Sequence, residues 1–131
     1  MNHFFYGTLM RGLMWNHLLK GQKFLGEAVC PYAKLYLLPS TQHPIPVMVD
    51  SRLLKDQTFG ELWDINEPRL ALDLRAFEVQ AGYHPVQRKI IFLNGQTVLA
   101  RCFIYPEGVI TPEFQPVVGG DFRKFLGGRN E

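Results

Sequence analysis

The sequence lacks the features that would direct it to a membrane, to nucleic acid or to export. No run approaches the roughly 18 consecutive apolar residues of a membrane span. Lys and Arg number 14 against 12 Asp and Glu, and no basic cluster occurs, so we expect no nucleic-acid partner. The N-terminus has no basic segment followed by a long apolar one and a cleavage site. We therefore expect a cytoplasmic protein without a membrane anchor.

Cysteine is scarce, and metal-ligand spacing is missing. Cys30 and Cys102 are the only cysteines. They could pair, but two buried free thiols are favoured in a cytosolic protein. The four histidines show no HxxxH spacing, and the two glycine pairs lack the Lys-Ser/Thr of a phosphate loop. The sequence therefore predicts no metal and no cofactor.

The composition that remains is that of a globular protein. Hydrophobic residues make up 47% and charged residues 20% of 131 residues, and no linker or internal repeat interrupts the chain. We expect one domain over residues 1–131.

Short apolar runs separated by Pro and Gly predict about seven strands. They are expected over residues 1–6, 23–30, 33–38, 46–49, 58–65, 88–93 and 96–105. Asn94-Gly95 favours a hairpin with a type I′ turn. A helix is predicted over residues 66–77 with Asn66 as its N-cap, and a short one over residues 11–20. The fold class is α+β: β-rich, with a curled or barrel-like sheet and one or two flanking helices.

The segment after the first strand is the first candidate for chemistry. Tyr6, Gly7, Thr8 and Leu9 follow an aromatic run that reads as a strand. A strand that opens into a glycine turn can aim successive backbone N–H groups at one point. Such a concavity suits an anion, or an oxygen that becomes one during a reaction.

Glu78 is the second candidate. Helical positions advance by about 100°, which places Leu74 at about 40° and Phe77 at about 340° from Leu70. Glu78 falls at about 80°, toward the same apolar side, and near the negative end of the helix dipole. Burial and the dipole both raise a carboxyl pKa, which suits a proton shuttle near neutral pH. The alternative is a structural ion pair with Arg88 or Arg75.

Four segments occur in an order that resembles a known family. They are Phe5-Tyr6-Gly7-Thr8-Leu9, Gly60-Glu61-Leu62-Trp63, Leu74-Arg75-Ala76-Phe77-Glu78 and Val86-Gln87-Arg88. Together with Gly120-Asp121-Phe122 they resemble the γ-glutamylcyclotransferase-like superfamily, which includes γ-glutamylamine cyclotransferase and avirulence-induced-gene-like domains. The resemblance covers nearly the whole chain. Arg75 and Val86 depart from the pattern, which has Asp and Tyr at those positions.

The resemblance implies a mostly antiparallel, barrel-like domain with helices alongside. It implies an enzyme that cyclises a γ-glutamyl amine or γ-glutamyl amino acid to 5-oxoproline and releases the amine. Glu78 would be the general acid and base, since the nucleophile is the substrate's own amine. The residues expected to bind this small-molecule substrate are Tyr6, Gly7, Thr8, Leu9, Arg88 and Tyr105.

Other assignments stay open at this stage. Glu61 is a rival acid, because strand alternation with Phe59 and Trp63 allows it to face inward. As a structural residue it would be either exposed at a strand edge or paired, for example with Arg88. His84 could line the mouth of the site. The domain could also bind a small ligand or a partner without turnover, or transfer a γ-glutamyl group in a biosynthetic pathway. We expect a monomer or a weak homodimer.

Overall fold

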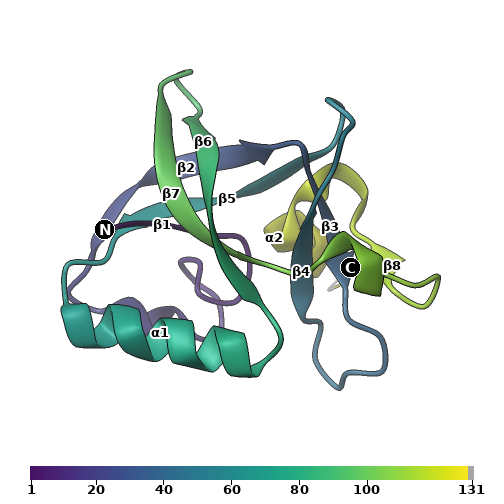
Figure 1. Ribbon diagram of the computed structural model, residues 1–131, viewed down its shortest axis with the longest axis horizontal. Helices are drawn as coiled ribbons and strands as arrows, with labels where there is room; N and C mark the ends of the chain where they lie inside the picture. Colours follow the sequence, from purple (N-terminus) through teal and green to yellow (C-terminus); the bar gives the residue numbers. More distant parts are fainter. Residues whose placement is uncertain (130–131) are drawn as a thin grey trace.

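The computed structural model describes residues 1–129, and its centre is a closed five-stranded barrel (Figure 1). Around the barrel the order is β1 (Asn2–Phe5), β5 (Gln57–Asp64), β2 (Lys23–Pro31), β6 (His84–Phe92) and β7 (Thr97–Ile104). Neighbouring strands are antiparallel except β1 and β7, whose parallel pairing closes the barrel. The expected barrel-like, mostly antiparallel α+β fold is confirmed.

A second, smaller sheet stands beside the barrel at the right of Figure 1. Its order is β4 (Pro46–Asp50), β3 (Ala33–Leu37) and β8 (Gln115–Pro116), all antiparallel. The two-residue strand β8 was not predicted, because two residues carry no alternation that a sequence pattern can reveal.

The two α-helices are α1 (Pro68–Gln80), at the lower left of Figure 1, and α2 (Phe122–Arg129), near its centre. Short 3₁₀ turns are η1 (Asn16–Leu19), η2 (Glu107–Val109) and η3 (Val118–Gly120). The helix predicted over residues 11–20 is therefore only the turn η1. The glycine pair at 127–128 hid α2, since glycine disfavours helix interiors.

The N-cap of helix α1 lies one residue later than predicted. The side chain of Glu67, and not that of Asn66, caps it by accepting hydrogen bonds from the N–H groups of Arg69 and Leu70 at 3.2 and 2.8 Å. Pro68 occupies the first turn, where its missing N–H is not needed. The helix continues past Phe77 to Gln80.

The buried line of α1 also differs from the expected stripe. Leu74 is 5% exposed, whereas Phe77 is 70% exposed. Leu70 and Glu78, one turn to either side of Leu74, are half-buried. The helix contacts the rest of the protein along this i, i+4 line, so Phe77 turns to solvent while Glu78 stays partly covered.

The hairpin between β6 and β7 forms, but its turn is not type I′. A type I′ turn needs positive φ at both central residues. Gly95 has φ 91°, whereas Asn94 does not have a positive φ. The N–H of Phe92 donates to the carbonyl of Gln96 at 2.8 Å and closes a loop of three residues.

The barrel interior is apolar and closely packed. Phe4, Leu62 and Ile90 are at most 1% exposed. Cys30 and Cys102 are buried free thiols, as expected. Within the described residues, no helix is both long and apolar enough to cross a bilayer.

Gly60 is required by close packing and provides a test of the barrel. A Cβ there would overlap the carbonyl oxygen of Phe5 and the ring of Phe4. We expect Gly60→Ala to lower the free energy of unfolding by about 1–3 kcal/mol, measured by urea titration, because the core must be overpacked. Gly108→Ala, where a Cβ meets nothing within 4 Å, is the matched control. Equal midpoints for the two variants would contradict this account.

Candidate functional site

The chain leaves the barrel after Phe5 and turns at once. The turn is closed by the N–H of Met10 on the carbonyl of Gly7 at 3.1 Å and by the N–H of Trp15 on the carbonyl of Thr8 at 2.9 Å. A Cβ on Gly7 would come within 2.8 Å of the Pro46 ring at the start of β4. Glycine thus allows this turn to pack against β4.

Three successive amides in this turn have no acceptor within the described part of the chain. Among residues 1–129, no group accepts a hydrogen bond from the N–H of Gly7, Thr8 or Leu9. Adjacent N–H groups of this kind are suited to an anion or to a developing oxyanion. The predicted loop therefore has the free donors that its predicted role requires.

The hydroxyl of Tyr6 forms hydrogen bonds with the backbone of two other strands. It donates to the carbonyl of Phe103 at 2.6 Å and accepts from the N–H of Met48 at 3.2 Å. Burial, assisted by the nearby Tyr83 and Glu78, raises the pKa of Tyr6 well above its usual value. Tyr6 thus stays protonated and joins the end of β1 to β7 and β4, at the base of the loop.

Glu78 is a half-buried carboxylate that has no partner among the residues described by the structure. Burial raises its pKa to about 7. Within the described part of the chain its side chain forms no hydrogen bond or ion pair, so neither Arg75 nor Arg88 pairs with it. Its charge raises the pKa of Tyr6 and of Tyr105, which places the acid and these phenols in one neighbourhood.

Two tyrosines hold the C-terminal end of α1 next to β4. Tyr83 donates its hydroxyl to the carbonyl of Pro46 at 2.8 Å, and Tyr105 donates to the carbonyl of Ala81 at 2.9 Å. Their rings meet edge to face at 4.7 Å between centroids. Tyr105 thus lies close to Glu78, with its hydroxyl donating to the end of α1, and its role in substrate binding stays a prediction.

Tyr83 and Pro46 were not assigned to the site from sequence. Tyr83 follows Glu78 by five residues, and its position near the departure at Val86 was the available signal. Pro46 carries no such signal, because its contacts with Gly7 and Tyr83 join segments that are distant along the chain.

Arg88 is engaged elsewhere. Its guanidinium forms a two-pronged ion pair with Asp50 at the end of β4, with N···O distances of 2.6 and 3.0 Å. The hydrogen bonds that the guanidinium donates to Asp50 raise the pKa of Arg88. The structure therefore does not bring the Arg88 guanidinium to Glu78.

Glu61, the rival acid, is fully buried and saturated with donors. Its partners are Arg11 and Arg123, each at 3.0 Å, and not Arg88. Burial raises the pKa of Glu61, but hydrogen bonds from Arg11, Arg123 and Trp63 outweigh burial, and the net shift is downward. Glu61 therefore remains ionised and is a poor proton shuttle at neutral pH.

The placement of His84 at the mouth of the site stays a prediction. His84 is exposed. The described residues include no group of three or more His, Cys, Asp or Glu side chains that could hold a metal ion.

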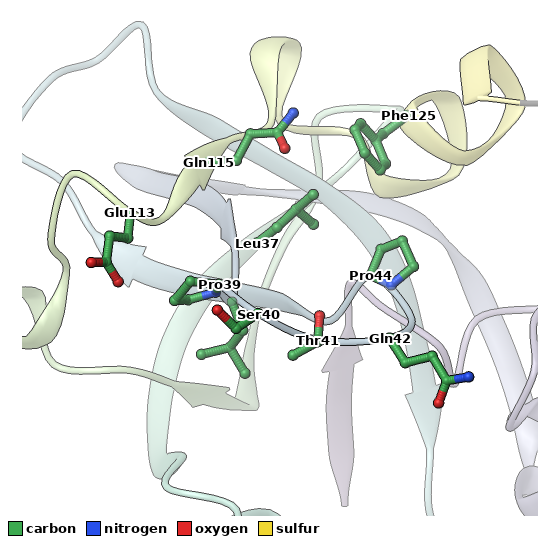
Figure 2. Close-up of a pocket in the computed structure, with 10 residues that line it drawn as sticks. Leu37, Pro39, Ser40, Thr41, Gln42, Pro44, Glu113, Gln115 and Phe125 are labelled. Carbon is green, nitrogen blue, oxygen red and sulfur yellow. The ribbon is translucent and has the colours of Figure 1, made fainter.

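A pocket of about 620 Å³ lies apart from these residues, between the β3–β4 loop and the segment that leads into β8 (Figure 2). In Figure 2, Gln115 and Phe125 lie on one side of it, and Thr41 and Pro44 on the other. None of the predicted site residues lines it.

The sequence of residues 3–124 matches the family described as gamma-glutamyl cyclotransferase, AIG2-like. The chain belongs to this family. The match includes the Gly7–Leu9 turn, Glu78 and the strands between them, so the resemblance seen in the sequence is confirmed. No curated protein sequence matches the chain.

Solved structures share the AIG2-like fold at low identity. An uncharacterized protein from Pyrococcus horikoshii is 22% identical with a TM-score of 0.72, over 99% of this chain and 96% of that one. An AIG2-like protein from Mus musculus is 22% identical with a TM-score of 0.65, over 86% and 80%. A gamma-glutamyl cyclotransferase is 19% identical with a TM-score of 0.64, over 80% of this chain and 66% of that one.

The unpaired Glu78 makes the stability of this AIG2-like domain depend on pH. Its pKa is 4.5 in the unfolded reference and about 7 when folded. The folded state thus binds the proton more tightly, and this stabilisation is complete below about pH 4.5 and lost as the pH rises through about 7. Between about pH 5 and 8 we expect the free energy of unfolding of Glu78→Gln, measured by urea titration, to rise by about 1–3 kcal/mol relative to that of the wild type.

Glu107→Gln is the control for this titration, because Glu107 is exposed. Its free energy of unfolding is expected to follow that of the wild type across the same pH range. Parallel curves for Glu78→Gln and the wild type would show that the folded pKa of Glu78 is not raised.

Proposed function

We propose that this protein is a γ-glutamyl cyclotransferase that converts a γ-glutamyl amine or γ-glutamyl amino acid to 5-oxoproline and the free amine. The observation that carries the proposal is Glu78, a half-buried carboxylate with a pKa of about 7 and no partner among residues 1–129. The Gly7–Leu9 turn of this family member has amides that no described residue accepts from. A base of that pKa operates best near neutral pH.

The reaction needs proton transfer between two nitrogens and no external nucleophile. The substrate's α-amine attacks its own γ-carbonyl carbon, so one C–N bond forms and the amide C–N bond breaks. The α-amine is mostly protonated near pH 7, so it loses one proton before the attack and a second as the lactam N–H forms. Glu78 accepts a proton from the α-nitrogen and gives it to the leaving nitrogen, while the other proton passes to solvent and the released amine takes one up. The base is thus regenerated and no water is consumed.

The amides of Gly7, Thr8 and Leu9 supply the anion site in this proposal. They would hold the α-carboxylate of the glutamyl unit or the oxyanion that develops on the γ-carbonyl. Removal of one donor to an oxyanion typically costs about 3–4 kcal/mol of transition-state stabilisation. Holding the amine against the carbonyl makes a further large contribution to the rate, because the ring closure is intramolecular.

Three assignments stay predictions beside this proposal. The extent of the domain over residues 1–131, the cytoplasmic location and the monomeric or weakly dimeric state are all expectations from sequence. The same holds for the leaving group, since the departures at Arg75 and Val86 lie beside Glu78 and not in the loop.

Glu78→Gln is expected to lower the rate of 5-oxoproline release by at least about 10²-fold, because the amide cannot accept the proton. A panel of γ-glutamyl amines and γ-glutamyl amino acids, with 5-oxoproline measured by mass spectrometry, checks this. For the wild type, kcat/KM is expected to fall on the acid side of about pH 7 as Glu78 becomes protonated.

Glu107→Gln again serves as the control and is expected to keep wild-type activity. Full activity of folded Glu78→Gln would remove Glu78 from the mechanism. If the wild type forms no product from the panel but is stabilised against heat by 5-oxoproline or glutamyl compounds, the domain binds this ligand without turnover.

A further inference from the structure

The backbone of Arg11, at the end of the candidate loop, is held at both of its polar groups. Its N–H donates to Oε1 of Glu61 at 2.9 Å. Its carbonyl accepts from Nη2 of Arg123 at 2.8 Å. The side chain of Arg11 adds an Nε contact of 3.0 Å to Oε2 of Glu61. The peptide groups on either side of Arg11 are therefore fixed in orientation.

Both ends of the loop are attached to the same residue of β5, Glu61. The last residue of β1, Phe5, pairs with Glu61 of β5. The side chain of Glu61 then binds Arg11 after the turn. Residues 6–10 are thus tied at both ends to one position in the barrel wall, and the free amides of Gly7, Thr8 and Leu9 lie between the two ties.

Helix α2 places Arg123 next to Glu61 and Arg11. Oδ1 of Asp121 accepts from the N–H of Lys124 at 3.1 Å and caps the start of α2. Gly120 has φ 69° and lies so close to the carbonyl of Gln57 that a Cβ would overlap it. Phe122 is 1% exposed. The Gly120-Asp121-Phe122 segment therefore anchors α2 on β5, with Arg123 directed at Glu61 and Arg11.

Glu61 has no capacity left for a ligand or a proton. Oε1 accepts from the Arg11 N–H and from Trp63 Nε1, and Oε2 accepts from Arg11 Nε and from Arg123 Nη2. A carboxylate offers about four acceptor sites, so four donors saturate it. The carboxylate is fully buried. Its contacts serve the loop and not the substrate.

We infer that Glu61 and Arg123 are positioning residues that hold the Gly7–Leu9 amides in the geometry that binds the glutamyl carboxylate. This inference rests on the proposed function for the identity of the ligand. Neither side chain touches the reacting atoms. A loop that is already ordered needs no rearrangement to bind an anion, which is the advantage of preorganised donors.

Arg123→Ala tests kinetically the clamp, by which we mean the contacts of Glu61 and Arg123 with Arg11. Loss of the Arg123 contacts frees the carbonyl of Arg11, so kcat/KM for the γ-glutamyl substrate is expected to fall at least about tenfold, mainly through KM. The pH profile is expected to keep its acid-side pKa, because Glu78 is untouched. Arg123→Lys is expected to recover part of the loss, since an ammonium can still donate to one of the acceptors.

Lys124→Ala is the matched control, since Lys124 is the next residue on α2 and is exposed. Unchanged kcat/KM in Arg123→Ala, or an acid-side pKa that moves, would overturn the inference. Arg123 is itself 39% exposed, so its truncation opens no sealed cavity. If Arg123→Ala does not fold, Arg123→Lys carries the same test with a smaller expected loss.

A ligand-free measurement separates this inference from the proposed function. We expect Arg123→Ala to shift the backbone amide resonances of Gly7, Thr8 and Leu9 in ¹⁵N spectra and to lower their order parameters, and Lys124→Ala to leave them unchanged. A wild type without turnover would refute the proposed function alone. Loop amides that stay the same in Arg123→Ala would refute the clamp, whether or not the enzyme is active.

Discussion

The short strand β1 is the constraint on which the remaining architecture depends. It has four residues, Asn2–Phe5, yet it pairs antiparallel with β5 and parallel with β7 and so closes the barrel. Because the chain must leave the barrel at Tyr6, the following turn lies at the rim, next to Pro46 of β4. The hydroxyl of Tyr6, bonded to Phe103 and Met48, joins the three strands at this corner. The position of the free amides is thus a consequence of barrel closure.

Two carboxylates near this rim show how the surroundings assign different roles to the same group. Glu61 is fully buried but receives four donors, so its pKa is lowered and it acts as a structural anion. Glu78 is less buried but receives none from the described residues, so its pKa rises to about 7. Desolvation dominates where partners are missing, and hydrogen bonds dominate where they are present. Proton exchange near neutral pH is therefore available to Glu78 alone of the two.

Much of the fold and half of the site were accessible from residue patterns. Alternation and turn residues located the barrel strands, and the Tyr6–Leu9 turn and Glu78 were found from a glycine after a strand and from a helical wheel. Errors occurred where a neighbour decides the outcome. Phe77 is exposed because α1 packs along the line of Leu74 and Glu78. The ion pair of Arg88 with Asp50 joins β6 to β4 and was not expected, while the role of Arg88 in substrate binding stays a prediction. Helix α2 was hidden by its glycines and is anchored by tertiary packing of Phe122.

The sequence by itself determined the family, the β-rich architecture and the two segments that carry the proposed chemistry, because these depend on local residue type, spacing and order. Only the tertiary structure decided that Glu61, and not Glu78, has partners among the described residues, that the Tyr6 hydroxyl bonds two other strands, and that Arg123 contacts Arg11. Each of those outcomes depends on a contact between segments tens of residues apart, and no local pattern records the distance between them. Whether a carboxylate can exchange a proton, or a backbone N–H can donate to a ligand, therefore depends on tertiary packing.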